Sequence, residues 1–253
     1  MNKKIKTYII NLKESTDRKE YMEEVMAPFG WLDIEYIEAV NGKQMSDSEL
    51  RESFDQDKAK RHYGRELRPG EIGCTLSHKK CAQMLLDSDH HCALFLEDDL
   101  LWQTEKLEKV FDEISTLLNT PKPMVVLISG DYWYTCLSDF YDKYKMANVM
   151  DAVCTQSYFI NRAGAQKLIE LGNWHLADDW RAIHRKGVQL KALYPHVADQ
   201  NRADLKTVIA PVYGGQKRKE MALWHLVESY WKSLSNKILV KMGHFEAKNF
   251  RWK

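Results

Sequence analysis

Short apolar runs alternate with amphipathic segments along most of the chain. Apolar runs of roughly four to eight residues are typical of buried strands, and apolar positions three and four apart are typical of helices. The expected strands span 5–12, 33–40, 92–97, 124–129, 152–161 and 189–194, and the expected helices span 16–28, 46–60, 74–85, 104–119, 162–171 and 180–187. This alternation predicts an α/β fold with a mixed, mainly parallel sheet flanked by helices.

Two segments modify this outline. Strand 189–194 is expected at an edge of the sheet, because Pro195 follows it and proline is confined to strand ends and edges. Residues 132–150 are aromatic and irregular. We interpret this segment either as a loop or hairpin over a cleft or as aromatic side chains packed on the core.

The pattern changes after Pro211. Residues 217–241 place apolar side chains on one helical face and Lys232, Lys237 and Lys241 on the other. We therefore expect a main domain over 1–212 and a basic amphipathic helical extension over 213–253. Such a helix can lie on an anionic membrane surface, pack against the main domain or contact a second copy of the chain in a homodimer.

Composition narrows the class of protein. The 253 residues are 44% hydrophobic, which is ample for a core, and the formal charge of +1 does not favour nucleic acid as a partner. Five scattered cysteines without a CxxC pair indicate neither a zinc site nor a disulfide framework, so we expect a reducing, cytoplasmic compartment. The apolar stretch 7–12 is too short for a signal peptide, and no run reaches the ~20 residues of a membrane span.

Three carboxylates, Glu97, Asp98 and Asp99, follow the apolar run 92–96. Ligands bind beyond the carboxyl ends of strands in open α/β sheets, and close carboxylates repel one another unless a cation shares them. Their hard oxygen atoms suit Mg²⁺ or Mn²⁺, which usually bridge to substrate phosphates. The alternative is that these acids cap the next helix, whose start is better marked by Thr104.

Five segments in order resemble glycosyltransferase family 25, which includes bacterial lipooligosaccharide galactosyltransferases and collagen galactosyltransferase domains. They are Ile10-Asn11-Leu12 with Ser15, Asp17 and Arg18; Tyr36 to Gly42; Gly70 to His78; Leu94 to Leu100; and Ser157 to Ala165. The resemblance covers most of residues 5–210. It implies a GT-A, Rossmann-type fold and inverting transfer of a sugar, with galactose as the first candidate, from a UDP-sugar to an acceptor hydroxyl.

The resemblance also implies roles for single residues. Asp99 is the expected ligand of Mn²⁺ or Mg²⁺, while Asp98 ligates the metal or holds hydroxyls of the donor, and Glu97 completes the acid cluster. His196 and His184 are candidates for a later metal ligand or for structural histidines. The remaining donor-site candidates are Asn11, Arg18, Ser77, His78 and Gln200. For Arg18 and His78 the alternatives are a surface cation and a histidine satisfied within its helix.

Inversion requires a general base on the acceptor hydroxyl. The family often has Pro-Val-Asp where this chain has Leu176-Ala-Asp178-Asp179, so two aspartates compete for that role. We favour Asp179, because an apolar residue, Trp180, follows it. The alternative is that Asp179 caps the helix that begins at Trp180.

A lipooligosaccharide or lipopolysaccharide acceptor at the inner membrane face would suit the basic C-terminal helix. The donor stays open among UDP-galactose, UDP-glucose and UDP-N-acetylglucosamine. Two other functions compete with transfer: a metal-dependent phosphohydrolase, which also uses clustered acids, and an inactive sugar-nucleotide binder. A second dense acid or histidine cluster, which the phosphohydrolase would need, is not evident along the chain.

Overall fold

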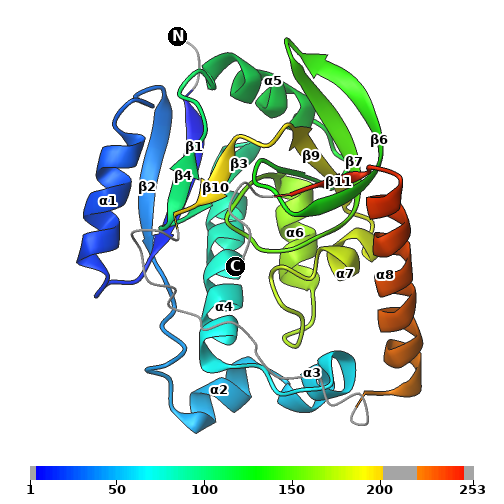
Figure 1. The fold of residues 1–253 in the computed structure, drawn as a ribbon. Coiled ribbons are helices and arrows are strands. Elements are labelled where there is room, and N and C mark those ends of the chain that lie inside the picture. Colours follow the sequence, from blue (N-terminus) through cyan, green and yellow to red (C-terminus); the bar gives the residue numbers. More distant parts are fainter. Residues whose placement is uncertain (1–3, 202–220, 248–253) are drawn as a thin grey trace.

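A nine-stranded sheet runs through the molecule (Figure 1) in a computed structural model that describes residues 4–201 and 221–247. Its strands are β1 (Ile5–Asn11), β2 (Leu32–Glu38), β3 (Cys92–Glu97), β5 (Met124–Leu127), β6 (Tyr132–Tyr141), β7 (Tyr144–Ala152), β8 (Ser157–Asn161), β9 (Gln189–Tyr194) and β11 (Phe245–Glu246). They lie in the order β11-β6-β7-β9-β5-β8-β3-β1-β2. Strands β2, β1, β3, β5, β9 and β6 run in one direction, and β8, β7 and β11 run against them. The predicted mixed, mainly parallel sheet is confirmed.

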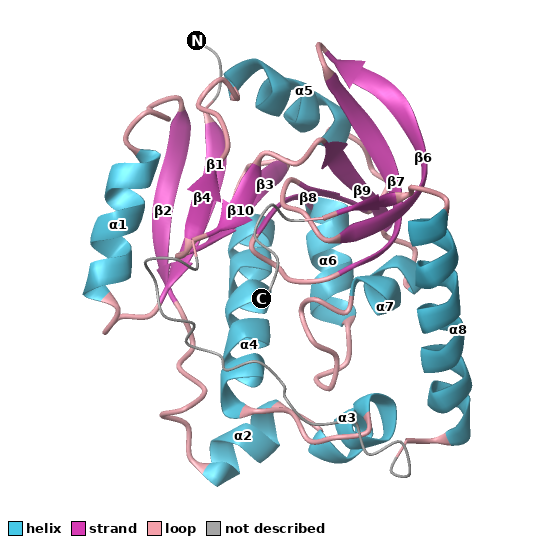
Figure 2. Cartoon of the chain, viewed as in Figure 1, coloured by secondary structure: helices cyan, strands magenta, loops and turns pink. Residues whose placement is uncertain are grey.

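Helices cover both faces of this sheet (Figure 2). The described helices are α1 (Thr16–Met26), α2 (Asp47–Ser53), α3 (Gln56–Tyr63), α4 (Pro69–Asp87), α5 (Glu108–Leu118), α6 (Arg162–Glu170), α7 (Trp180–Arg185) and α8 (Leu223–Lys241). Side chains of α4, α6 and α7 join the core on one face, and those of α1 and α5 join the core on the other. The α/β class expected from the hydrophobic pattern is therefore correct.

Strand β3 lies at the centre of both cores. Phe95 belongs to the core under α4, while Leu94 and Leu96 belong to the core under α5, and all three side chains are fully buried. Burial on both faces explains why this strand is a continuous apolar run rather than an alternating one. It also fixes the position of the acids that follow it.

A short second sheet continues from this point. Strand β4 (Leu100–Trp102) pairs antiparallel with β10 (Ala198–Gln200), and Gln200 lies opposite Leu100. The pairing brings Gln200 next to the acids at the end of β3, although about one hundred residues separate them in the chain. The amide of Asn201 also donates to the carbonyl of Asp99 at 2.7 Å.

Two expected helices differ from the structure. The segment 46–60 forms two helices. Phe54, which ends the first helix, is buried, and Asp55 caps α3 by accepting from the amide of Lys58 at 3.0 Å. Helix α5 begins at Glu108 instead of Thr104, whose hydroxyl accepts from the amide of Lys106 in the preceding turn. The three acids consequently lead into β4 and do not cap a helix.

The expected edge position of β9 is wrong. The strand pairs with β5 on one side and with β7 on the other, because the hairpin β6–β7 adds further strands to the sheet. Pro195 lies just beyond the strand, so its missing amide hydrogen leaves the ladder intact. Residues 132–150 therefore form a hairpin, and buried side chains such as Tyr132, Tyr134 and Tyr144 pack within it.

The C-terminal segment lies along the outer edge of the hairpin (Figure 1). Lys232 and Asn236 of α8 contact the fully buried Asp151 at 3.1 and 2.7 Å, and Ser235 accepts from Arg181 at 2.9 Å. The opposite face of α8 exposes Leu223, Trp224, Tyr230 and Trp231. The predicted boundary at 212/213, the basic residues 217–219 and the end at 251–253 lie outside the described residues. No described helix combines the length and apolarity that crossing a membrane requires.

Candidate functional site

A pocket opens at the carboxyl ends of the three parallel strands β1, β2 and β3. Its polar lining includes Arg18, Lys43, Cys74, His78, Glu97 and Asp98. Apolar side chains that follow β1 and β2, among them Leu12 and Val40, form much of the rest. The position agrees with the crevice in which open α/β sheets bind ligands.

Beside the pocket, two glycines allow the loop after β2 to contact α4 through close backbone approach, and one of them, Gly42, lines the pocket. A β-carbon on Gly73 would lie 2.7 Å from the amide nitrogen of Gly42, and one on Gly42 would collide with the carbonyl of Pro69. Ser77 joins the same two segments, since its hydroxyl accepts from the amide of Val40 at 2.8 Å and donates to the carbonyl of Gly73 at 2.7 Å. The loop after β2 is thereby held against α4.

The acids beyond β3 form a buried polar cluster. Asp98 accepts from Asn11 at 2.8 Å and from Arg18, whose guanidinium also donates to Asp99 at 3.0 Å. Gln200 donates to the same oxygen of Asp99 at 2.6 Å. Three predicted donor-site residues, Asn11, Arg18 and Gln200, thus contact Asp98 or Asp99 directly, and the two acids are only 6% and 5% exposed.

Burial dominates the electrostatics of this cluster. It raises the pKa of Asp98 to about 6 against the opposing effect of Arg18. Burial and the neighbouring charge of Glu97 raise the pKa of Asp99, although Gln200 and Arg18 oppose them. The Oδ1 atom of Asp99 is buried and has no hydrogen-bond partner. A hard divalent cation would satisfy this oxygen, so the residues present fit such an ion.

Glu97 faces a different set of partners on the α4 side. Its carboxylate accepts from Thr155 at 2.6 Å and lies 3.5 Å from Nε2 of His78. His78 is fully buried, and its Nδ1 lies 2.9 Å from the hydroxyl of Tyr158. His78 is therefore held in place through Nδ1 and lines the pocket, while its buried Nε2 has no hydrogen-bond partner among the described residues.

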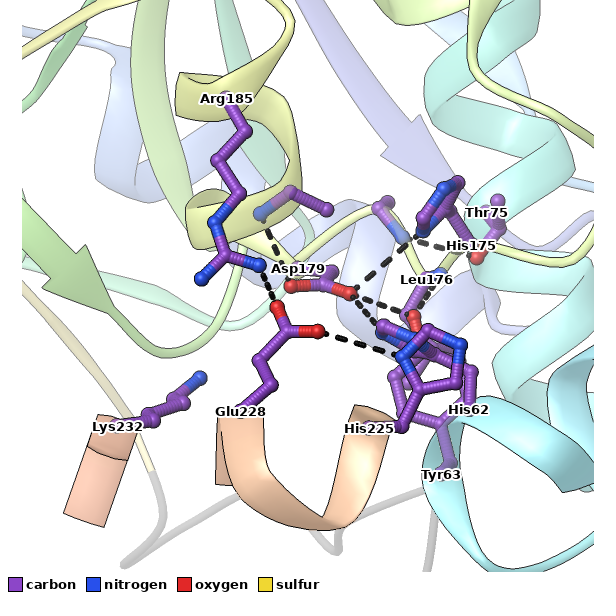
Figure 3. A network of polar contacts seen from close by, with 12 residues as sticks. His62, Tyr63, Thr75, His175, Leu176, Asp179, Arg185, His225, Glu228 and Lys232 are labelled. Carbon is purple, nitrogen blue, oxygen red and sulfur yellow. Dashed lines mark hydrogen bonds and ion pairs between the residues drawn. The ribbon is translucent and has the colours of Figure 1, made fainter. Parts of the chain in front are cut away.

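The two aspartates before α7 have separate surroundings. Asp179 caps the helix, because its Oδ1 accepts from the amide of Ala182 at 3.2 Å, and its Oδ2 accepts from Tyr63 at 2.9 Å and lies 3.1 Å from Nε2 of His62 (Figure 3). The cap alternative for Asp179 is confirmed. Burial opposes ionisation of this group, but His175 and His62 outweigh it and hold the pKa of Asp179 well below its usual range.

Asp178 is not in the pocket lining, but it interacts electrostatically with Glu97 and Cys74, which are part of that lining. Its carboxylate accepts from the backbone amide of Cys154, which precedes the Thr155 that contacts Glu97. Cys154 has a φ of 67°, and its carbonyl accepts from the indole of Trp180 at 2.8 Å. Burial, followed by the charge of Asp179, raises the pKa of Asp178. The loop 153–156 therefore connects Asp178 with the acid cluster.

The two candidate histidines lie apart from Asp98 and Asp99. His196 places Nδ1 2.6 Å from Glu246 and Nε2 3.3 Å from Asp199, so both ring nitrogens face carboxylates. His184 contacts the carbonyl of Val188 at 3.0 Å near the end of α7. Neither contact involves the acids beyond β3.

Sequence reasoning did not identify Lys43 and Thr155 as parts of the site. Lys43 follows the Asn41-Gly42 turn and brings a second cation to the pocket beside Arg18. Thr155 hydrogen-bonds Glu97 from an irregular segment that was assigned to a strand. Asn41-Gly42 is a turn dipeptide that could have indicated the first position, whereas nothing in the local pattern indicates the second.

The sequence is similar to that of known glycosyltransferases. The model described as "Glycosyltransferase family 25 (LPS biosynthesis protein)" matches residues 4–181. A "Glycosyltransferase 25 family member" of Aedes aegypti is 34% identical over 99 residues, which are 38% of this chain and 16% of that protein. "Procollagen galactosyltransferase 2" of Homo sapiens is 26% identical over 168 residues, 64% of this chain and 27% of that protein. The matched regions are thus small parts of these curated relatives.

Proposed function

Because the chain belongs to glycosyltransferase family 25, we propose that it transfers a hexose from a UDP-sugar to an acceptor hydroxyl. Galactose is the first candidate for the sugar, since the human relative is a procollagen galactosyltransferase. Lipooligosaccharide or lipopolysaccharide is the first candidate for the acceptor, in keeping with the family description. The matched range contains the pocket and both Asp178 and Asp179.

The observation that carries this proposal is the pocket at the ends of β1, β2 and β3. It combines two cations, Arg18 and Lys43, with the apolar wall that Leu12 and Val40 provide. Cations of this kind favour the diphosphate of a nucleotide sugar, and an apolar wall favours the planar base. The acid cluster at its edge distinguishes this pocket from a simple anion site.

A divalent cation, Mn²⁺ or Mg²⁺, fits the proposed reaction. Asp99 would hold it through the buried Oδ1, with Asp98 as a second candidate ligand. When bound, such a cation supplies charge stabilisation to the departing diphosphate. Arg18 would add a positive charge of the protein itself to this stabilisation, because its guanidinium lines the pocket and contacts both Asp98 and Asp99.

We assign the general base to Asp178 rather than Asp179. Asp179 is engaged as a helix cap and as an acceptor from Tyr63, and its depressed pKa makes it a weak base. Asp178 and Glu97 both accept hydrogen bonds from the loop 153–156. The raised pKa of Asp178 lies nearer to the working pH, as a general base requires. Asp178 would therefore accept the proton of the acceptor hydroxyl.

Helix α8 would help the enzyme to reach an acceptor that is carried by a membrane lipid. Its exposed Trp224, Tyr230 and Trp231 are side chains that favour the boundary between water and lipid. Peripheral contact with a membrane would bring a lipid-borne acceptor close to the enzyme. Dimer formation through the same face is the competing arrangement, and sedimentation with and without anionic vesicles separates the two.

The decisive experiment measures UDP release from UDP-galactose, UDP-glucose and UDP-N-acetylglucosamine. Each donor is tested with Mn²⁺ and with EDTA, using lipooligosaccharide or a hydroxylysine peptide as acceptor. We expect metal-dependent turnover that prefers one donor and is lost in Asp99→Asn. An absence of turnover together with an absence of UDP binding in calorimetry would contradict the proposal and favour a phosphohydrolase, which cleavage of phosphate esters would reveal.

A further inference from the structure

A cluster of histidines lies away from the acids beyond β3, where α3 meets the C-terminal helix (Figure 3). Nδ1 of His62 on α3 lies 2.9 Å from Nδ1 of His225 on α8. Glu228, one turn further along α8, places Oε2 3.3 Å from the same nitrogen of His225. The ligand atoms of His62, His225 and Glu228 all lie within 4.8 Å of one another.

The orientation of His62 is set from its other side. Its Nε2 lies 3.1 Å from Oδ2 of Asp179, and the side chains of His62 and Asp179 are only 13% and 11% exposed. An imidazole that donates Nε2–H to this carboxylate has a lone pair on Nδ1, which faces His225. A histidine held by a carboxylate in this manner is the usual arrangement of a metal-ligating histidine.

The spacing on α8 supports the same interpretation. His225 and Glu228 are three residues apart and therefore lie on one face of the helix. Glu228 keeps its two oxygens for different partners, because Oε1 pairs with Arg185 and Oε2 faces His225. A salt-bridged carboxylate of this kind is held in place while one oxygen stays directed at the histidines.

We propose that His62 Nδ1, His225 Nδ1 and Glu228 Oε2 bind a divalent transition-metal ion of the zinc class. Two imidazoles and one carboxylate are a ligand set that suits Zn²⁺, with the fourth position left to water. A cavity lined by Ser229, Lys232 and Ser233 adjoins the three side chains and provides room for that water. Asp179 acts as a positioning residue through His62.

A second trio, His62, His175 and Asp179, has ligand atoms at similar separations but fits a metal less well. Oδ1 of Asp179 caps α7, and its Oδ2 accepts from Tyr63 at 2.9 Å. The positive charges near His62, His225 and Glu228 do not strongly repel a metal ion bound there, because Arg185 pairs with Glu228 and Lys232 pairs with Asp151. A metal at the favoured site would join α8 to α3.

The test titrates metal-free protein with Zn²⁺ against a chromophoric chelator and records the visible absorption of the Co²⁺-substituted protein. We expect one tightly bound equivalent in the wild type, in Asp99→Asn and in His184→Ala, which is a matched histidine control on α7. His225→Ala and His62→Ala should lose that equivalent together with the Co²⁺ spectrum. Asp179→Asn, which preserves the cap, should weaken binding by about 10- to 100-fold.

The inference is independent of the proposed transfer reaction, since the readout is metal binding and not turnover. Glu228→Gln provides a further variant if His62→Ala fails to fold, and it should alter the Co²⁺ spectrum and weaken binding. A tight equivalent that persists in His225→Ala and Glu228→Gln would overturn the proposal. So would an affinity of the wild type that does not exceed that of His225→Ala.

Discussion

Asp178 and Asp179 adjoin in the chain, but their carboxylates accept hydrogen bonds from different segments. Asp178 accepts from the backbone amide of Cys154 on the pocket side, and Asp179 accepts from that of Ala182 in α7. The pKa of Asp178 is raised, first by burial, whereas the pKa of Asp179 is lowered because His175 and His62 outweigh burial. Asp179 therefore serves the fold as a helix cap, and Asp178 is the base that we propose.

Paired amide substitutions test this division. Asp178→Asn should lower kcat by about 10²–10⁴-fold, the range for loss of a general base, with little change in the KM for the donor. Asp179→Asn retains an oxygen for the cap, so we expect a smaller loss of turnover. Steady-state kinetics decide the matter, and a larger loss in Asp179→Asn would return the role to that residue.

Arg18 is expected to stabilise the fold as well as to bind the donor. Its guanidinium is the cation shared by the buried Asp98 and Asp99. Breaking a buried ion pair from one side costs about 3–5 kcal/mol, because a charge is left without its partner. The free energy of unfolding in urea should fall by this amount in Arg18→Met. The double variant Arg18→Met/Asp98→Asn should recover part of that free energy, and equal stabilities of the two variants would argue against this account.

Gly73 is expected to tolerate no side chain. Its β-carbon would meet backbone atoms of Val40 and Gly42, which cannot move without shifting the pocket wall. We expect Gly73→Ala to lower the free energy of unfolding by about 1–3 kcal/mol. It should also weaken UDP binding in calorimetry. Gly30→Ala is the control, since no atom lies within 4 Å of a β-carbon there.

His196 should make stability depend on pH in the alkaline range. Burial alone would lower the pKa of His196, but Asp199 and Glu246 outweigh it and raise the pKa from 6.5 to about 9. The charged imidazole is favoured in the folded state, so its contribution is complete below pH 6.5 and is lost as the pH rises through 9. The loss amounts to about 3 kcal/mol at 1.36 kcal/mol per pH unit. Urea unfolding below pH 6.5 and above pH 9 should show this loss of stability in the wild type and not in His196→Gln.

The parts of the fold that local pattern determines were predictable. Strand β3 is a continuous apolar run because both of its faces are buried, and the acids at its end lie where strand ends predict a crevice. The helix expected from residue 46 likewise begins there, because Ser46 caps α2 through a capping box with Glu49. Local rules were sufficient at these positions.

The parts that depend on distant partners were not predictable. The interior position of β9 is decided by the hairpin β6–β7, whose pairing with it leaves no mark within 189–194. His62 and His225 are 163 residues apart, so no sequence spacing indicates their contact. The different surroundings of Asp178 and Asp179 also depend on Cys154 and Tyr63, neither of which is adjacent in the chain.

The short strand β11 has a consequence for the solubility of the chain. It pairs Phe245 and Glu246 with Trp133 and Tyr132 on β6, the outermost strand of the hairpin. An edge strand without such cover offers unpaired backbone groups to other chains and promotes aggregation. A chain shortened to end at Lys241 should therefore self-associate, which light scattering during storage would detect. Residues 245 and 246 thus limit edge-to-edge pairing with a second chain at the start of β6.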